Sequence, residues 1–522
     1  MNKKWIAATA LCLTAGLVFS GCGEKKTTGA GGEITYPSDG SIYPMQCADT
    51  LSVYTSFDTE TEKMQYWQET TGVKLDFSSS ISSAGSEALS LMIASDDLPD
   101  ILLTDLSTQP GGVQKYADDN VIIDLTDAMK NYAPNFTKLM SENDEIRKMS
   151  TSDDGKNYFF PTIRNSNKLR SYRGPIIRKD LLEKHHLDVP ETIDDWYNML
   201  TTFKNDGIQA PLCYQVDYYE QAGGLAGAYG VIADFYHEGD TVKYGYLEDG
   251  MREALKMLAK WYKEGLLDQN IVNASSNMDN NIVNGKSAVV FSTSGGGMGK
   301  YLRAGKEQTA DYDLVAAALP VLNKGEKQKF SSSVTPVSYN NNGFVTTKCT
   351  NVELATRFLD FGYSEEGHMQ MNFGKEGVSY EMKDGKPIYT DLIMNNPDGL
   401  SVGDAMTEWI FANWSGPFAQ DDGYIEQYNQ YQQQKDALEL WGSKLETSRA
   451  MPPVSFTSEE SNRISTIMNN VKTCADENLY KFIMGIKSVD TDYDAFISEL
   501  KGFGIDEAIE IYATALERYN KR

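Results

Sequence analysis

Residues 51–105 read LSVYTSFDTETEKMQYWQETTGVKLDFSSSISSAGSEALSLMIASDDLPDILLTD, and this stretch decides the fold. Short segments of strand character alternate in it with segments of helical spacing: the predicted strands are 51–54, 73–77 and 100–103, and the predicted helices are 59–71 and 86–95. Gly72 ends the first helix, and Pro99 stops the second because proline disfavours helical backbone in its predecessor. This alternation predicts an α/β fold with a mostly parallel, covered sheet.

The same alternation returns after residues 158–161. The predicted strands there are 174–178 and 287–291, and the predicted helices are 180–186, 192–203, 251–264 and, at the far end, 506–522. Thr192 is the expected N-cap of the helix that it opens. A chain of 522 residues is long enough for two cores. We therefore predict two α/β lobes that separate near residues 160–175.

The first residues predict export. Lys3 and Lys4 precede an apolar segment from Trp5 to Phe19, which is shorter than the roughly 20 residues of a membrane span. The ending Phe19-Ser20-Gly21-Cys22 resembles the lipobox of bacterial lipoproteins, although that family usually has Leu where Phe19 stands. The resemblance implies cleavage after residue 21 and lipidation of Cys22. The alternative is a plain secretory signal in which Cys22 is incidental.

Composition narrows the location and the ligand. Residues 22–46 are rich in Gly, Thr and Ser, which predicts a flexible tether to the extracellular face of the cell membrane. The formal net charge of −26 argues against nucleic acid and against anionic lipid headgroups as partners of the protein body. It favours a neutral or cationic ligand, unless the charge serves only solubility. We expect a monomer.

No cysteine or acidic cluster predicts a metal site. Cys47, Cys213, Cys349 and Cys474 lie far apart, so zinc spacing is missing, while disulfides and isolated buried thiols both stay open. The run Asp490, Asp492, Asp494 begins like a calcium loop but has Ala495 and Lys501 where such a loop needs Gly and Glu. We expect a solvated turn that caps the next helix, and we expect no cofactor.

Several segments, in order, resemble larger members of the family 1 extracellular solute-binding proteins of carbohydrate ABC transporters. They are MIASDDLPDILLTD (92–105), GPIIRKDLLEKHHLDVPETIDDWYNMLTTFK (174–204), LAKWYKEGLLDQNI (258–271), GKSAVVFS (285–292), MNFGKEGVSYEMKDGKPIYTD (371–391) and the ending from Lys481 to Tyr519. The resemblance implies a two-lobed, periplasmic-binding-protein-like fold of type II, with a hinge and a ligand cleft between the lobes. It also implies a protein that captures an oligosaccharide and delivers it to an ABC permease.

On this basis the chain divides into a signal peptide (1–21), the tether (22–46), lobe 1 (47–165), lobe 2 (166–335) and a last part (336–522) that returns across the hinge and completes both lobes. Other functions stay open: the same fold binding a peptide, a sensor that presents ligand to a membrane kinase, or an extracellular enzyme acting on polysaccharide. No Ser/His/Asp arrangement carries a local signature, so we predict no catalytic residues.

Sugar sites combine aromatic faces with polar groups that fix orientation. The cluster Trp409, Asn413, Trp414 has this composition, although core packing of the two indoles is the alternative. Other candidates follow predicted strands, because loops at the carboxyl ends of strands face the cleft of open α/β sheets. They are Tyr54, Phe57, Asp105, Ser294 and Gly296, together with Tyr218 and Tyr219 of an aromatic-rich loop. A flexible turn is the alternative for the glycine run at 295–297.

Overall fold

The computed structural model describes residues 50–55, 57–77, 85–107, 109, 111–413 and 415–522. The predicted signal peptide, Cys22, the tether, Cys47 and Trp414 lie outside the described residues. Among the described residues, no helix is long and apolar enough to cross a membrane.

Sheet 1 organises the part of the chain that we call lobe 1. Its strands run in the order β14 (Phe418–Ala419), β4 (Phe160–Ile163), β11 (Val337–Val345), β3 (Ile101–Thr104), β1 (Thr50–Thr55) and β2 (Lys74–Asp76). The predicted parallel pairing holds for β2, β1 and β3. Strand β11, which the sequence pattern did not predict, lies antiparallel between β3 and β4, because the chain re-enters the sheet from the other lobe.

Sheet 2 organises lobe 2, with the strand order β10 (Leu314–Ala316), β5 (Arg173–Arg178), β9 (Val289–Thr293) and β6 (Leu212–Cys213). Strand β5 is antiparallel to both of its neighbours, so the expectation of a mostly parallel sheet is wrong for sheet 2. Alternate residues serve two cores: Ile177 and Val289 face one, and Ile176 and Val290 face the other. The sheet is therefore covered on both faces, as predicted.

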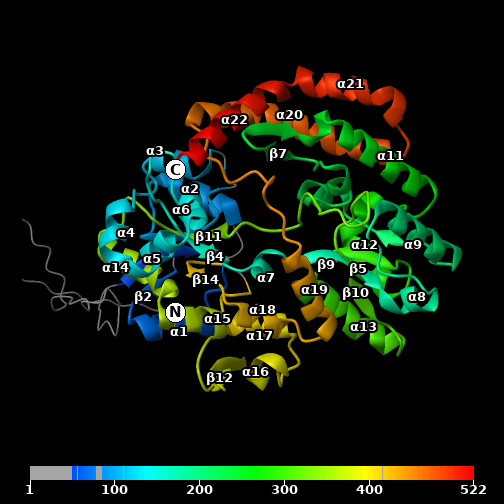
Figure 1. Ribbon diagram of the computed structural model, residues 1–522. Helices are drawn as coiled ribbons and strands as arrows, with labels where there is room; N and C mark the ends of the chain where they lie inside the picture. Colours follow the sequence, from blue (N-terminus) through cyan, green and yellow to red (C-terminus); the bar gives the residue numbers. More distant parts are fainter. Residues whose placement is uncertain (1–49, 56, 78–84, 108, 110, 414) are drawn as a thin grey trace, which may run out of the picture.

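Helices surround each sheet (Figure 1). Around lobe 1 they are α1 (Glu62–Thr71), α2 (Gly85–Ser95), α3 (Gly112–Asp118), α4 (Thr126–Tyr132), α5 (Pro134–Glu142), α6 (Asp144–Ser150), α14 (Val352–Asp360), α15 (Glu365–Phe373), α16 (Asp391–Met394), α17 (Val402–Trp409) and α18 (Asp422–Tyr428). Around lobe 2 they are α8 (Lys179–Lys184), α9 (Ile193–Asn205), α10 (Val216–Tyr219), α11 (Asp249–Lys263), α12 (Ala274–Val283), α13 (Lys300–Gln308), α19 (Gln432–Ser443), α20 (Ser458–Ile483), α21 (Val489–Gly502) and α22 (Ile505–Asn520).

Local chemistry explains where several of these helices begin. Helix α9 starts at the predicted cap: the hydroxyl of Thr192 accepts from the Asp195 amide at 3.1 Å, and the Asp195 carboxylate accepts from the Thr192 amide at 3.0 Å. The acidic run that begins like a calcium loop forms the first turns of α21, where Asp492 accepts from the Ser488 amide at 2.7 Å. No group of metal-binding residues occurs in the described part of the chain.

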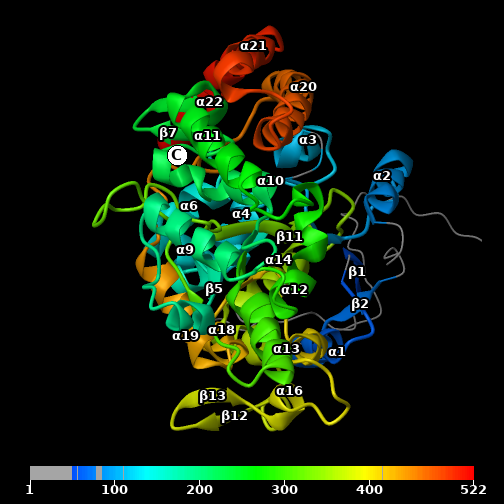
Figure 2. The same cartoon turned by 90° about the vertical axis from the view of Figure 1, so that its right-hand side faces the viewer.

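The chain crosses between the lobes more than once. It leaves sheet 1 after Ile163, runs through α7 (Asn167–Arg170) and enters sheet 2 at Arg173. It returns between β10 and β11, and helices α20, α21 and α22 then lie across one end of the molecule (Figure 1). The small hairpin of β12 (Tyr380–Lys383) and β13 (Lys386–Tyr389) lies at the opposite end (Figure 2), while a second hairpin pairs β7 (Phe235–Glu238) with β8 (Thr241–Tyr244).

The described cysteines are free thiols. Cys213 and Cys474 are buried, and Cys349 is partly buried. Burial raises the pKa of Cys213 to about 12, so its thiol stays protonated at neutral pH. These residues act as small apolar side chains in the cores, which is the second of the two alternatives that their spacing left open.

Candidate functional site

A pocket of about 240 Å³ lies where the two lobes meet. Its walls come from the first crossover, from the loop after β9 in lobe 2, and from the chain on either side of β14 in lobe 1. The lining residues are Arg164, Leu169, Tyr172, Thr293, Ser294, Gly295, Gly296, Ala412, Asn413, Gln420, Tyr424, Ile425, Tyr428 and Asn429. We call it the crossover pocket.

The loop after β9 supplies the lobe 2 wall. Strand β9 ends at Thr293, whose hydroxyl accepts from the Gly297 amide at 3.0 Å and so fixes the turn. The amide of Ser294 donates to the Tyr172 carbonyl at 2.8 Å, and its carbonyl accepts from the Gln434 side chain at 2.7 Å. The backbone of Ser294 is thereby fixed, while its buried hydroxyl has no hydrogen-bond partner among the described residues.

Amide side chains and a guanidinium form the lobe 1 wall. Asn413 donates to the Gly403 carbonyl at 3.1 Å and accepts from the Tyr424 hydroxyl at 3.4 Å. Gln420 donates to the Ala412 carbonyl at 2.7 Å and accepts from Arg164 Nε at 3.1 Å. These bonds orient the polar groups before any ligand arrives, which lowers the entropy lost on binding.

Tyrosine rings give the pocket its apolar surface. Tyr424 and Tyr428 lie one turn apart on α18, and their rings stack with centroids 6.2 Å apart at 11°. Burial raises the pKa of both hydroxyls, so they stay neutral donors across the physiological range. Flat rings beside amides and hydroxyls suit a ligand that has apolar faces and many hydroxyl groups, as a sugar ring has.

Arg173 and Tyr218 lie beside this pocket. Arg173 is the β-sheet partner of Thr293, and its guanidinium lies 5.1 Å from the centre of the Tyr218 ring and hydrogen bonds to the Tyr218 hydroxyl. Tyr218 is 41% exposed, whereas Tyr219 is buried and meets the Tyr218 ring edge to face at 4.9 Å. The Tyr218 ring is therefore exposed beside the pocket and held in place by Arg173.

A buried carboxylate supports this wall from behind. Glu220 accepts from the Tyr214 hydroxyl at 2.8 Å and from the amides of Ala226 and Leu225 at 2.7 and 3.3 Å. Burial raises the pKa of Glu220 to about 7, although these hydrogen bonds oppose the rise. Glu220 thus ties the strand end at Tyr214 to the chain that follows α10.

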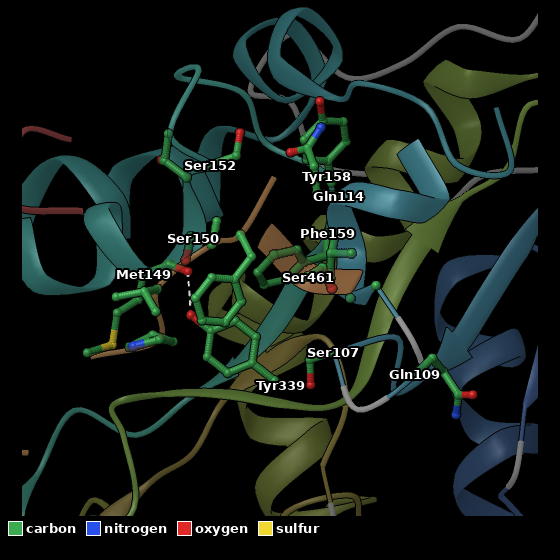
Figure 3. A pocket seen from close by; sticks show the side chains of 18 of the residues that line it. Ser107, Gln109, Gln114, Met149, Ser150, Ser152, Tyr158, Phe159, Tyr339 and Ser461 are labelled. Carbon is green, nitrogen blue, oxygen red and sulfur yellow. Dashed lines mark hydrogen bonds between the residues drawn. The ribbon is translucent and has the colours of Figure 1, made fainter. Parts of the chain in front are cut away.

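A second, larger pocket of about 690 Å³ lies between lobe 1 and α20 (Figure 3). Tyr339 lines this pocket, and its hydroxyl donates to the Met149 carbonyl at 2.6 Å. The Tyr339 ring lies 5.7 Å from the Phe159 ring, measured between centroids. Ser107, Gln109 and Ser461 add polar groups. Its arginine, Arg522, is in an ion pair with Asp153 at 2.6 Å, so this pocket carries no uncompensated guanidinium.

The structure brings some of the predicted site residues together and not others. Ser294, Gly296 and Asn413 line the crossover pocket, and Tyr218 lies beside it through Arg173. Tyr54, Phe57 and Tyr219 are buried, and Trp409 is partly buried against the lobe 1 core. Asp105 accepts from the Ser107 hydroxyl at 2.7 Å, close to the larger pocket. Trp414 is outside the described residues.

Sequence reasoning missed Arg164, Tyr172, Gln420, Tyr424, Tyr428 and Asn429, which all line the crossover pocket. One signal was available: Tyr424 and Tyr428 are four residues apart, which places both rings on one face of a helix. No signal of this kind pointed to Arg164, because its partner Gln420 is 256 residues away in the chain.

Comparison with known proteins places the chain among exported binding proteins. The family model described as bacterial extracellular solute-binding protein matches residues 51–369. The fructooligosaccharide ABC transporter substrate-binding protein FusA of Streptococcus pneumoniae serotype 4 is 24% identical, over 99% of both chains. Lipoprotein LipO of Bacillus subtilis is 23% identical, over 98% of this chain and 95% of its own.

Among solved structures, the alginate-binding protein AlgQ2 without calcium ion superposes with a TM-score of 0.73. It is 24% identical, and the match covers 90% of this chain and 98% of AlgQ2. This likeness confirms the prediction of a two-lobed α/β fold.

Proposed function

The chain belongs to the family of bacterial extracellular solute-binding proteins, and from that premise we propose that it captures an oligosaccharide outside the cell for an ABC importer. The observation that carries the proposal is the crossover pocket, where the stacked tyrosine rings and oriented amides of lobe 1 meet the free hydroxyl group of Ser294 in lobe 2. FusA, which matches nearly the whole chain, is named for fructooligosaccharide and for this role, and supports the proposal.

The pocket explains how capture would be coupled to delivery. A ligand that contacts Ser294 of lobe 2 and Asn413 of lobe 1 stabilises the arrangement in which the lobes are close. The hinge we propose consists of the crossovers 164–172, 317–336 and 429–431. We propose lobe 1 at 47–165 and lobe 2 at 166–335, with residues 336–522 completing both. The ligand-bound form would then be the one that docks on the permease.

We also propose that the protein is held at the extracellular face of the membrane by lipid on Cys22. The basic start, the short apolar segment and the small residues before Cys22 support this anchor. LipO, which matches 98% of the chain, is named a lipoprotein. The glycine- and serine-rich residues 22–46 would let the lobes reach the permease.

Binding is favoured over catalysis by the composition of the pocket. None of its lining residues is acidic in the described chain, whereas glycoside hydrolysis needs a pair of carboxyl groups across the scissile bond. An extracellular enzyme acting on polysaccharide is therefore the weaker alternative, and release of reducing ends by the purified protein would support it.

Isothermal titration calorimetry against a panel of neutral and acidic oligosaccharides and peptides tests the proposal. We expect micromolar or tighter binding of at least one oligosaccharide, and a loss of about fivefold in Tyr428→Ala, because an aromatic contact is worth about 1 kcal/mol. Tyr262→Ala on α11, outside the pocket, is the matched control. Tight binding of a peptide without heat from any glycan would overturn the assignment.

A further inference from the structure

The crossover pocket holds an arginine without a counter-charge. Arg164 follows β4 directly, and its amide donates to the Pro336 carbonyl at 2.7 Å, so the first two crossovers fix its position. The side chain is partly buried and lines the pocket, where Nε donates to Gln420 at 3.1 Å. No carboxylate of the described residues forms an ion pair with Arg164, and no described residue accepts a hydrogen bond from its two terminal nitrogens.

Arg164 and its neighbour Arg173 differ from most other arginines of the described chain because neither has an acidic partner. The other arginines of the described chain are in ion pairs, except for the exposed Arg303; the paired ones are Arg147, Arg170, Arg178, Arg252, Arg357, Arg449, Arg463, Arg518 and Arg522. Arg173 has only neutral partners, the Tyr218 hydroxyl and the Ser333 carbonyl at 3.4 Å, and its Nε is buried without a hydrogen bond.

The guanidinium groups of Arg164 and Arg173 are close enough to influence each other electrostatically. Burial lowers the pKa of Arg164, the hydroxyls of Tyr172 and Tyr424 oppose that shift, and the like charge of Arg173 adds to it. A guanidinium nevertheless stays protonated in proteins, so both remain cations at physiological pH. Placing two like charges beside one pocket with no acid in its lining costs free energy in the empty protein.

Two further polar groups in the same pocket lack partners. Ser294 is 1% exposed and Asn429 is 0% exposed, and neither Ser294 Oγ nor Asn429 Oδ1 has a hydrogen-bond partner in the described chain. Natural proteins leave few buried polar atoms unpaired, so unpaired atoms of residues that line a pocket can take their hydrogen-bond partners from a bound ligand. Here a hydroxyl that can donate and an amide oxygen that can accept line the same pocket as the uncompensated guanidinium.

We propose that the captured oligosaccharide is acidic, and that a carboxylate of a sugar unit, of the uronic-acid type, binds Arg164 in the crossover pocket. This inference rests on the proposed function and names its substrate class. A carboxylate accepts two parallel hydrogen bonds from a guanidinium, which uses the terminal nitrogens that Arg164 leaves free. The Ser294 hydroxyl can donate to the same anion, and Asn429 Oδ1 can accept from a neighbouring sugar hydroxyl.

The net charge of the whole chain is negative, whereas the charge at the crossover pocket is positive. A net charge of −26 gives the surface no general attraction for an acidic glycan. The positive site is therefore local, and most other arginines are already neutralised by their own acids. Arg522 in the larger pocket is one of them, because Asp153 accepts from it at 2.6 and 2.8 Å.

The experiment compares matched ligands by isothermal titration calorimetry on the mature protein. The probes are trisaccharides of galacturonate, glucuronate and mannuronate, each beside its carboxyl-reduced, neutral counterpart. We expect one acid form to bind about 10- to 100-fold more tightly than its counterpart, as a charge-assisted hydrogen-bond pair implies. Arg164→Gln should remove this preference, and Arg164→Lys should retain part of it.

Binding of a carboxylate by Arg164 and capture of an oligosaccharide in general can be tested separately. Arg303→Gln removes an exposed charge and should leave the preference intact, while Arg173→Gln should reduce it even if Arg164→Gln fails to fold. A neutral counterpart that binds as tightly as its acid form, or an equal loss of both in Arg164→Gln, would overturn this inference and leave the proposed function standing. Absence of binding to every glycan, acidic or neutral, would overturn the proposed function and this inference with it.

Discussion

Gly295 of lobe 2 lies directly against the ring of Tyr428 of lobe 1: a Cβ atom at Gly295 would lie 2.7 Å from Tyr428 Cδ1. The two lobes therefore approach each other through a backbone that has no side chain. The glycine run that suggested a ligand contact or a flexible turn serves in part as a contact surface between the lobes.

Gly295→Ala is expected to weaken ligand binding by about tenfold or more, because the added methyl group separates the loop after β9 from Tyr428, and overpacking typically costs 1–3 kcal/mol. Calorimetric titration of the best oligosaccharide measures the effect. Gly502→Ala is the control, since a Cβ atom there meets nothing within 4 Å. Equal affinities of Gly295→Ala and wild type would mean that the ligand-bound lobes do not use this contact.

Glu220 should make stability fall as pH rises from about 4.5 to about 7. Its pKa is about 7 in the folded protein and 4.5 without burial, so between these values the folded state keeps a proton that the unfolded state has released. The contribution is fully present below pH 4.5 and lost above pH 7, and it amounts to about 3 kcal/mol.

Urea unfolding at pH 5 and pH 8 measures this effect. Glu220→Gln removes the titrating group with little change in shape, so the variant should lose less stability than wild type between the two pH values. The exposed Glu510→Gln should follow wild type. The prediction is contradicted if Glu220→Gln and wild type lose the same free energy of unfolding.

Asp153→Ala should lower the free energy of unfolding by about 2 kcal/mol, because a partly buried ion pair that loses one partner leaves the other charge uncompensated. Asp153 of lobe 1 binds Arg522 at 2.6 Å and Arg518 at 2.8 Å, and Arg518 binds Glu460 at 2.6 Å. Glu517→Ala breaks the Lys521 pair, whose side chains are 70% and 69% exposed, and should cost about 0.3 kcal/mol. Equal losses in urea unfolding would argue against a role for the Asp153 network.

Cys22→Ala should release the protein into the culture medium without changing its ligand affinity, because the lipid would be lost and the lobes left intact. Immunoblots of membrane and medium fractions measure the release, and calorimetry measures the affinity. Cys213→Ala is the control. The Cys213 thiol is buried in lobe 2, so this variant protein should stay in the membrane fraction. Retention of Cys22→Ala at the membrane would show that another feature anchors the chain.

The sequence predicted the parts of the fold that local pattern determines. The strands and helices between residues 51 and 104 follow from hydrophobic spacing and from the stops at Gly72 and Pro99. The antiparallel insertion of β11 did not follow, because its pairing with Ile101 and Ile163 depends on how the chain returns from lobe 2.

Some residues of the candidate site could also be predicted from local sequence, and others could not. Ser294 and Gly296 were accessible to prediction because loops after buried strands tend to face a cleft. The same rule placed Tyr54 and Phe57 near a cleft, but it says nothing about depth: Tyr54 is buried in β1, and Phe57 meets the Phe411 ring edge to face at 5.9 Å. Arg164 could not be predicted as a site residue from the sequence, because its contact with Gln420 exists only in the folded chain.

The central position of β11 in sheet 1 has a consequence for biosynthesis. A nascent chain that has emerged only as far as β10 contains β1, β2, β3 and β4, yet the strand that joins β3 to β4 is still to be made. Until residues 337–345 arrive, both strands present open edges that invite pairing with other chains. Lobe 1 therefore cannot complete its central sheet until residues 337–345 have been synthesised, although four of its strands precede β10 in the chain.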